Sequence, residues 1–286
     1  MIQKYIAFVK AAETGSFTHA AKQLNYTQSG VSRMIQDLEK EWGVVLFERS
    51  KLGITLTAQG KALLPQLQRI CNEHERLERQ LHEMHHLESG TIRIGTFSSV
   101  ATHWLPQLIK QFKQQYPHIE FELLLGDYQE IEQWIIEGRV DFGFLRTPTV
   151  LPMETIVVAR DRLLVVMPAS HPLADMDIFP MKALEESPFM LLEKGENDEI
   201  SRIFAAHNVQ PHVEFVTWDD YAIMSMVEHE MGISILPELI LQRIPYKIIT
   251  KELEVPAYRE IAIGVRMRNT LTFAAQRFLQ FIEQTI

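Results

Sequence analysis

The stretch "GSFTHAAKQLNYTQSGVSRMIQDLEKEWG" (residues 15–43) decides the fold of the N-terminal part of the chain. Gly15 is a common helix stop, and Ser16 and Thr27 are residues that cap helix N-termini with their side-chain oxygens. Gly43 ends the last helix in the same way. Short helices joined by tight turns predict a helix-turn-helix. The expected helices span residues 2–14, 17–25 and 28–42.

The segment "VVLFERSKLGITLT" (44–57) follows directly and is rich in β-branched and apolar residues. A turn at Lys51–Gly53 divides it into two short runs, which predicts a two-stranded hairpin. A hairpin that follows three such helices has the shape of a wing.

The third helix has one polar arc and one apolar arc. At 100° per residue, five polar side chains fall within about 140° of one another. Amides, hydroxyls and a guanidinium are groups that contact base edges and phosphates, although many polar helix faces are merely solvated. The first two turns contain neither Glu nor Lys, which favours the DNA-reading interpretation. The polar residues are Gln28, Ser29, Ser32, Arg33 and Gln36, and the opposite arc holds Val31, Met34, Ile35, Leu38 and Trp42.

Composition and charge indicate the number of domains, the location of the protein and the partner of its N-terminal part. A chain of 286 residues with 46% hydrophobic residues is typical of a globular protein with more than one domain. No apolar run approaches the roughly 20 residues of a membrane helix, and the N-terminus does not resemble a signal peptide. The single cysteine, Cys71, excludes an intramolecular disulfide, so we expect a cytoplasmic protein. Residues 1–61 carry a net charge of +3 and the remainder −12, which suggests that only the N-terminal part meets a polyanion.

A single long helix is expected from about residue 58 to residue 88. Its apolar residues follow alternating spacings of four and three, which is a heptad pattern typical of a coiled coil between two copies of a chain. His74 is the one polar residue of this seam. Pro65 falls near the start of the helix, where it can begin or kink it. The seam residues are Leu63, Leu67, Ile70, His74, Leu77, Leu81 and Met84.

The end of this helix, "HEMHH" (82–86), matches the H-E-x-x-H pattern of zinc proteases. A metalloprotease also needs a third ligand and a substrate cleft, and no later segment offers an evident ligand. Histidines near a helix C-terminus are favoured by the helix dipole in any case. We therefore interpret HEMHH as the last turn of the coiled coil and expect no metal, no cofactor and no catalytic residue.

Beyond Ser89 and Gly90, strands and helices alternate, which predicts an α/β body with mostly parallel sheets covered by helices. Side chains at the ends of parallel strands and the starts of the following helices face a cleft. They are candidates for a small-molecule site, although Ser98 and Ser99 could merely cap a helix. The expected helices are 99–116, 128–138, 198–207 and 220–231, and the candidate residues are Ser98, Ser99, Asp127, Arg146, Thr147, Glu193, Thr217 and Trp218.

At "FVKAAETGSFTHAAKQLNYTQSGVSRMIQDLEKEWGVVLFERSKLGITLTAQG" (8–60) the chain resembles the N-terminal domain of LysR-type transcriptional regulators. The likeness extends more loosely through "WLPQLIKQFKQQYPHIEFEL", "EGRVDFGF" and "EMGISILP". It implies a winged helix-turn-helix domain, a linker helix that forms a homodimer, and an effector domain of two α/β subdomains like a periplasmic binding protein. The implied boundaries are 1–58, 59–88 and 89–286, with subdomain I at about 91–160 and 267–286 and subdomain II at about 161–266.

The resemblance also implies roles for individual residues. Gln28, Ser29, Ser32 and Arg33 would contact double-stranded DNA. Gln36 on the same polar arc and the cap residue Thr27 complete the set of expected DNA-binding residues. Arg49 would support phosphate or minor-groove contacts at the wing, where Lys51 is the expected tip cation. Gly30 stands where the family usually has Ala or Pro, and Leu52 stands where Arg is frequent.

The effector would be a small molecule held in the same loops that the strand ends pick out. Arg146 would pair with a carboxylate, whereas Asp127, Glu193 and the acidic loop "LEKGENDE" would oppose an anion. Together they allow a zwitterionic or neutral ligand as readily as a small carboxylate. The assembly is expected to be a homodimer through residues 59–88, with a homotetramer left open.

Two other classes fit less well. A metal-dependent or serine hydrolase lacks a complete metal set and a G-x-S-x-G turn. A pure solute-binding protein would leave residues 1–88 unexplained. A DNA-binding regulator controlled by an effector is therefore the favoured prediction.

Overall fold

The computed structural model describes residues 1–50, 53–85, 89–192 and 199–286, with no account of the side chains of residues 50 and 82–85. The chain divides into two compact units. One comprises Met1–His85 with Glu137–Arg139, and the other comprises His86–Ile136 with Val140–Ile286. Each unit is described by itself.

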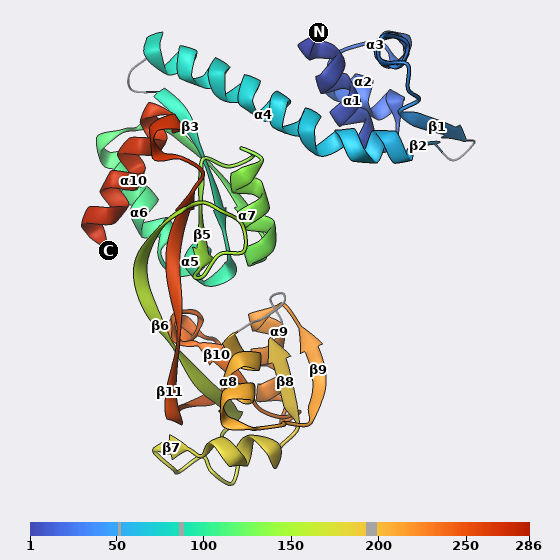
Figure 1. The fold of residues 1–286 in the computed structure, drawn as a ribbon. Coiled ribbons are helices and arrows are strands. Elements are labelled where there is room, and N and C mark those ends of the chain that lie inside the picture. Colours follow the sequence, from blue (N-terminus) through green and yellow to red (C-terminus); the bar gives the residue numbers. More distant parts are fainter. Residues whose placement is uncertain (51–52, 86–88, 193–198) are drawn as a thin grey trace. The chain divides into compact units, whose positions relative to one another are not determined.

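The N-terminal unit has the expected helix-turn-helix and wing (Figure 1). Gly15 and Gly43 end helices in the left-handed conformation, with φ of 61° and 68°. Ser16 and Thr27 accept hydrogen bonds from the backbone amides of His19 and Gly30, so the predicted caps are confirmed. The elements are α1 (Ile2–Thr14), α2 (Phe17–Gln23), α3 (Gln28–Trp42), β1 (Phe47–Ser50), β2 (Gly53–Leu56) and α4 (Ala58–His85).

Thr57 fixes the junction between the wing and α4. Its hydroxyl donates to the carbonyl of Val45 over 2.7 Å and accepts from the amide of Gly60 over 3.0 Å. A Cβ on Gly60 would lie 2.4 Å from the carbonyl oxygen of Leu46, so only glycine allows this close approach. The start of α4 is therefore held against the wing.

The core of this unit is formed by the inner faces of all three short helices and the wing. Phe47 packs against Phe8 and Phe17 with ring centroids 5.4 Å apart in each pair. Leu67 and Cys71 of α4 complete the same core. Burial, with smaller contributions from Glu75 and Glu13, raises the pKa of the Cys71 thiol to about 11, so this thiol stays protonated and unreactive near neutral pH.

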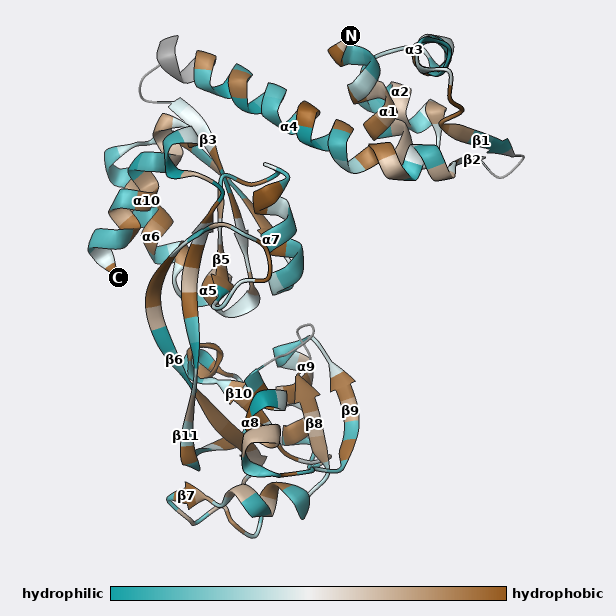
Figure 2. Ribbon diagram, in the orientation of Figure 1, coloured by the Kyte–Doolittle hydropathy of each residue, from teal (hydrophilic) through white to brown (hydrophobic). Residues whose placement is uncertain are grey.

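The C-terminal unit contains two hydrophobic cores, one in each α/β subdomain. Its strands are largely apolar, as Figure 2 shows for β5, β6 and β8. The strands are β3 (Ser89–Thr96), β4 (His118–Leu125), β5 (Phe142–Arg146), β6 (Glu154–Pro168), β7 (Ile178–Phe179), β8 (Phe189–Leu192), β9 (Val213–Thr217), β10 (Ser234–Pro237) and β11 (Ile248–Val265). The helices are α5 (Ser98–His103), α6 (Leu105–Gln115), α7 (Tyr128–Ile136), α8 (Glu199–His207), α9 (Asp220–Glu228) and α10 (Phe273–Thr285), with short 3-10 turns η1 (Met181–Glu185), η2 (Glu238–Arg243) and η3 (Arg268–Thr270).

The expectation of mostly parallel sheets holds only in part. The large sheet has the order β10-β6-β11-β5-β3-β4, with β7 beside β11. β3 is parallel to β4 and β5, and β8 is parallel to β9, as predicted. β11 is antiparallel to both β5 and β6, and β10 is antiparallel to β6. The sheet is mixed because β6 and β11 are long strands that serve both subdomains, a feature that local patterns do not reveal.

β6 and β11 connect the two subdomains side by side (Figure 1). Arg259 lies opposite Asp161, and from Ile261 onward β11 pairs with β5 of the first subdomain. The second crossing therefore lies near residue 260 rather than the expected 266. We call the paired segments around Asp161 and Arg259 the hinge ribbon.

The helix expected over residues 99–116 is two helices. α5 ends at His103 and α6 begins at Leu105, with Trp104 at the junction. Pro106 lies in the first turn of α6, where its missing amide N–H breaks the hydrogen-bond ladder of one continuous helix.

Candidate functional site

The polar arc of α3 faces away from the core. Gln28, Ser29, Arg33 and Gln36 are exposed and Ser32 is half-buried, whereas Val31, Ile35 and Leu38 are buried on the other side. Thr27 is exposed, and its hydroxyl lies 3.2 Å from that of Ser29. The structure therefore brings the six candidate residues of this segment onto one exposed surface of the helix.

Arg49 of the wing lies beside this surface. Its guanidinium donates a hydrogen bond to the Ser32 hydroxyl over 3.4 Å and covers the ring of Phe17 at 5.1 Å. A cation placed over an aromatic ring keeps its charge while its position is fixed. The wing cation and the polar arc of α3 thus form one continuous surface. Lys51 and Leu52 lie outside the described residues.

The seam of α4 divides into two parts. Leu67 belongs to the core of its own unit, whereas Ile70, Leu77 and Leu81 are 46%, 52% and 44% exposed. His74 is half-buried, and the side chain of Met84 lies outside the described part. Exposed large apolar residues at heptad spacing indicate a surface that another helix can cover.

The side chains of residues 82–85, and residue 86 altogether, lie outside the described part of the chain, so the geometry of HEMHH stays unassigned. Among the described residues, no group of three or more His, Cys, Asp or Glu side chains could hold a metal ion. In the same part of the chain, no helix is long and apolar enough to cross a membrane.

The candidate effector residues differ in their surroundings. Ser98 is half-buried at the start of α5. Asp127 caps α7, because its carboxylate accepts from the amide of Glu130 while its own amide donates to the Glu130 carboxylate. Thr217 accepts from the amide of Asp219 over 3.3 Å, and Trp218 is 71% exposed. Glu193 lies outside the described residues.

Ser99 is buried and belongs to a network centred on Arg259, a residue that the sequence analysis did not single out. The Arg259 guanidinium donates to Asp161 over 2.6 and 2.9 Å, to the Ser99 hydroxyl over 2.7 Å and to the Tyr128 hydroxyl over 2.9 Å. It also covers the ring of Phe97 at 5.0 Å. The only sequence signal for this network is a group of charged residues directly before an apolar run, in "ARDRLLVV" (159–166) and "YREIAIGV" (258–265).

The charge of Arg259 is stable despite its burial. Burial alone would lower the pKa of the guanidinium, but its interactions with Tyr128, Asp161 and Asp220, including the hydrogen bonds to Asp161, outweigh burial and raise the pKa above its ordinary value. Asp161 is satisfied in turn, because its second oxygen accepts from the amide of Leu239 over 2.9 Å. The network therefore joins α5, α7, η2 and the hinge ribbon through one buried ion pair.

Arg146 and Thr147 also make contacts that span the two subdomains. Arg146 forms an ion pair with Glu199 of α8 at 3.1 Å and covers the ring of Tyr128 at 5.3 Å. The Thr147 hydroxyl donates to the carboxylate of Glu260 over 2.8 Å. In this state the cavity enclosed by Tyr128, Glu199 and Arg259 is only about 20 Å³.

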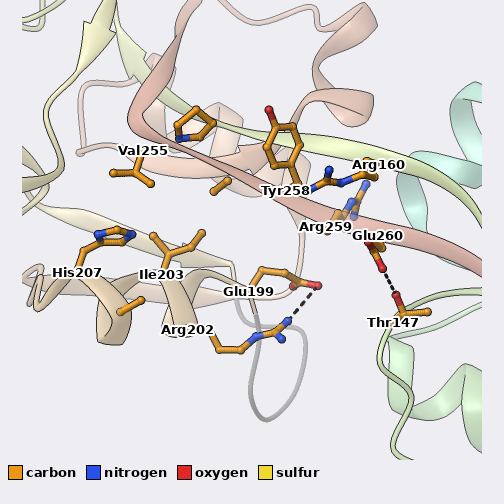
Figure 3. Close-up of a pocket in the computed structure, with 13 residues that line it drawn as sticks. Thr147, Arg160, Glu199, Arg202, Ile203, His207, Val255, Tyr258, Arg259 and Glu260 are labelled. Carbon is orange, nitrogen blue, oxygen red and sulfur yellow. Dashed lines mark hydrogen bonds and ion pairs between the residues drawn. The ribbon is translucent and has the colours of Figure 1, made fainter.

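A larger cavity of about 390 Å³ lies beside the hinge ribbon, between α8 and residues 255–260 of β11 (Figure 3). Thr147, Arg160 and Glu199 line its charged end, and Ile203 and Val255 line its apolar end. Of the predicted effector residues, Thr147 alone lines this cavity, within the part of the chain that the structure describes.

The family model for the bacterial regulatory helix-turn-helix protein of the LysR family matches residues 2–61. The model for the LysR substrate-binding domain matches residues 85–286. The chain belongs to the LysR family of transcriptional regulators. The suspected resemblance is confirmed, and this LysR-type regulator carries a DNA-binding head and an effector-binding domain.

Relatives agree with this assignment along the whole chain. It is 33% identical over 280 residues to the uncharacterized HTH-type regulator YvbU of Bacillus subtilis (strain 168), covering 97% of this chain and 96% of YvbU. It is 32% identical over 275 residues to the probable HTH-type regulator LrrA of Synechococcus elongatus, covering 96% and 93%. The crystal structure of the LysR-family regulator CbnR has the same fold, with a TM-score of 0.77 and 21% identity, over 99% of this chain and 98% of CbnR.

We predict that Arg259→Met lowers the free energy of unfolding of the C-terminal unit by about 3–5 kcal/mol, because Asp161 is left as a buried charge without a partner. Urea unfolding can be followed by tryptophan fluorescence in a Trp42→Phe background, whose remaining tryptophans, Trp104, Trp134 and Trp218, all lie in this unit.

The matched control is Arg259→Met with Asp161→Asn, which removes both charges and keeps an oxygen for the amide of Leu239. This double variant is expected to recover at least half of the free energy of unfolding that Arg259→Met loses. A single variant that costs less than about 1 kcal/mol would contradict the role given to the ion pair.

Proposed function

We propose that this LysR-type regulator binds double-stranded DNA through the exposed arc of α3 and through Arg49 of the wing. The observation that carries the proposal is the continuous surface of amides, hydroxyls and guanidinium groups around Ser32 and Arg49. Side chains of this kind on a helix opposite a buried apolar stripe suit entry into a major groove. CbnR, which has the same fold, has been crystallised as the full-length protein with its target DNA.

In this proposal, Gln28, Ser29 and Ser32 contact base edges, and Arg33 and Arg49 contact phosphates. Thr27 and Gln36 support the two ends of the contact surface. Lys51, at the tip of the wing, is proposed to add a phosphate contact. The head holds no catalytic group in this proposal, so the protein acts by binding and not by chemistry.

We predict that Arg33→Ala weakens binding to all DNA sequences and reduces the slope of log K against log salt concentration by about one. Gln28→Ala is expected to relax sequence preference instead, with a loss of about 1–3 kcal/mol on the cognate site only. Both are measured by fluorescence anisotropy with the DNA upstream of the protein's own coding region and a scrambled duplex.

The control is Arg69→Ala, which removes the same charge from an exposed position of α4. If Arg69→Ala changes the salt slope as much as Arg33→Ala does, binding reflects net charge and not the arc of α3. A thousandfold preference of the natural protein for the cognate duplex would establish sequence specificity.

The exposed seam of α4 supports a homodimer. Ile70, Leu77 and Leu81 form an exposed apolar stripe on this helix, beside the stripe of Leu67 and Cys71 that packs into the core of the head. Burying such a stripe against the same stripe of a second copy stabilises the dimer by about 1.5–3 kcal/mol for each large side chain that is fully buried. A homotetramer built from two such dimers remains a further possibility within the proposal.

We predict that Leu77→Glu combined with Leu81→Glu halves the mass measured by sedimentation equilibrium, because it places like charges at the centre of the seam. Gln66→Glu adds a negative charge at an exposed position of the same helix and is expected to leave the mass unchanged. An unchanged mass for the seam variant would exclude α4 as the dimer interface.

The effector is proposed to enter the cleft between the subdomains, near Ser98, Ser99, Arg146 and Thr147. Asp127, Thr217 and Trp218 lie in loops at the ends of the neighbouring strands, and Glu193 is assigned to the same set by its place in the sequence. An anionic group of a ligand bound there must compete with the Glu199 carboxylate for the Arg146 guanidinium. Oε1 of Glu199 has no hydrogen-bond partner among the described residues, which suits an ammonium group beside a carboxylate on Arg146.

We predict that zwitterionic ligands raise the melting temperature by several degrees at saturation, as ligands that bind only the folded state must. A thermal-shift panel of free amino acids, their amides, and the dicarboxylates malonate, succinate and glutarate provides the measurement. Arg146→Gln is expected to abolish the shift. Stabilisation by the dicarboxylates alone would refute the zwitterion proposal.

The proposal places the protein in the cytoplasm, where its DNA target lies. The alternative of a metal-dependent hydrolase rests on HEMHH alone.

A further inference from the structure

The cavity of about 390 Å³ beside the hinge ribbon shares Glu199 and Arg259 with the small cavity of the proposed effector cleft and extends away from it along α8. Asp161 and Arg259 pair with each other inside the protein, and Arg259 lines the cavity together with the neighbouring residues Arg160, Tyr258 and Glu260. Successive side chains of a strand point to opposite faces, so the side chains of Tyr258 and Glu260 leave β11 on the face opposite to that of Arg259. The volume is at the lower end of the roughly 300–1,000 Å³ of small-molecule pockets.

An irregularity of β11 builds one wall of this cavity. Glu252 pairs with Leu164 and Ala257 pairs with Leu163, so residues 253–256 of β11 have no counterparts on β6. Pro256 cannot donate a ladder hydrogen bond, which suits its place in a bulge. The bulge contributes Val255 and Pro256 to the lining, opposite α8. Bulges of this kind commonly re-aim side chains beside functional sites.

The carboxylates of the cavity already have partners. Glu260 accepts from the Thr147 hydroxyl over 2.8 Å, and Glu199 pairs with Arg146 at 3.1 Å. The guanidinium groups are less engaged. Arg160 lies over the ring of Tyr258 at 4.6 Å and has no ion-pair partner within the described residues.

Arg202 is the second cation, and its side chain is half exposed. Its one ion contact among the described residues is with Glu199 at 4.0 Å, the outer limit for an ion pair. The charged end of the cavity therefore has two guanidinium groups that can donate hydrogen bonds to a bound anion. Its other end is apolar, with Ile203, Ala206 and Val255 near His207 (Figure 3).

We propose that this cavity is a second ligand site, which binds a small organic monoanion with an aromatic or branched apolar body. The carboxylate lies between Arg160 and Arg202, and the apolar body lies against Ile203, Ala206 and Val255. Thr147 belongs to the first subdomain, α8 belongs to the second, and β11 joins them. A bound ligand thus stabilises the subdomain arrangement that closes the cavity, from outside the cleft.

The test uses the full-length protein with phenylacetate and 4-methylpentanoate as probes, each paired with its neutral amide. Affinities are measured by isothermal titration calorimetry, supported by ligand-observed NMR. We expect saturable binding of at least one acid, and binding of its amide at least tenfold weaker. Arg202→Gln is expected to weaken binding of the acid at least fivefold and so to remove the difference in affinity between the acid and its amide.

Ala206→Trp fills the cavity and is expected to weaken binding of the acid at least tenfold. Ala205→Trp is the matched control, because Ala205 is equally exposed on α8 but does not line the cavity. Ser98→Ala, in the proposed cleft, is expected to leave the affinity unchanged. Thermal unfolding of each variant verifies that all are folded.

Three results would overturn the proposal. They are the absence of saturable binding of either acid up to 20 mM, equal effects of Ala205→Trp and Ala206→Trp, and equal affinities for acid and amide. If Ser98→Ala weakens binding of the acid and the cavity variants do not, the acid binds in the cleft instead. DNA binding of the same samples is measured separately, so a failure here leaves the proposed DNA contacts unaffected.

Discussion

The buried ion pair between Arg259 and Asp161 is the interaction on which the effector-binding domain depends. Taking two charges out of water costs several kcal/mol per ion unless every donor and acceptor finds a partner. Here the guanidinium reaches a carboxylate and two hydroxyls, and the carboxylate also receives a backbone amide. The pair lies where β6 and β11 pass from one subdomain to the other. It therefore holds the first turns of α5 and α7 to the two strands that form the hinge.

This position links the two ligand regions. The cleft side of the hinge ribbon holds Arg259 and Asp161, and the opposite side holds Arg160 and Tyr258. In the two proposals a ligand on either side contacts the same pair of strands, so occupation of one region would change the energy of closing the other. Coupling of this kind needs no long chain of contacts, because both sites bias one element that has two arrangements.

The sequence predicts the head far better than the body, and the reason is the distance between interacting residues. The caps at Ser16 and Thr27 and the stop at Gly43 act within three or four residues, so local patterns identify them. Arg259 is 98 residues from Asp161 and 160 from Ser99 in sequence. Nothing local says that two strands so far apart lie side by side, which is also why the antiparallel pairs were missed. Ser99 follows the end of β3, as the sequence predicts, and its hydroxyl accepts a hydrogen bond from Arg259 of the same chain; its contact with an effector stays a prediction.

The helix α4 has two adjacent apolar stripes, one packed into the core of the head and one exposed, and in the proposed homodimer this limits how the protein can respond to a ligand. Leu67 and Cys71 pack into the core of the head, while Ile70, Leu77 and Leu81 remain exposed at heptad spacing. Residues three or four apart on a helix move together, so in the proposed homodimer the head could not turn relative to a partner helix packed on the second stripe. Thr57, held between Val45 and Gly60, removes freedom at the other end of the same helix. An effector that alters the spacing of two heads must therefore shift whole α4 helices relative to one another, because the joint between head and helix is fixed by the core.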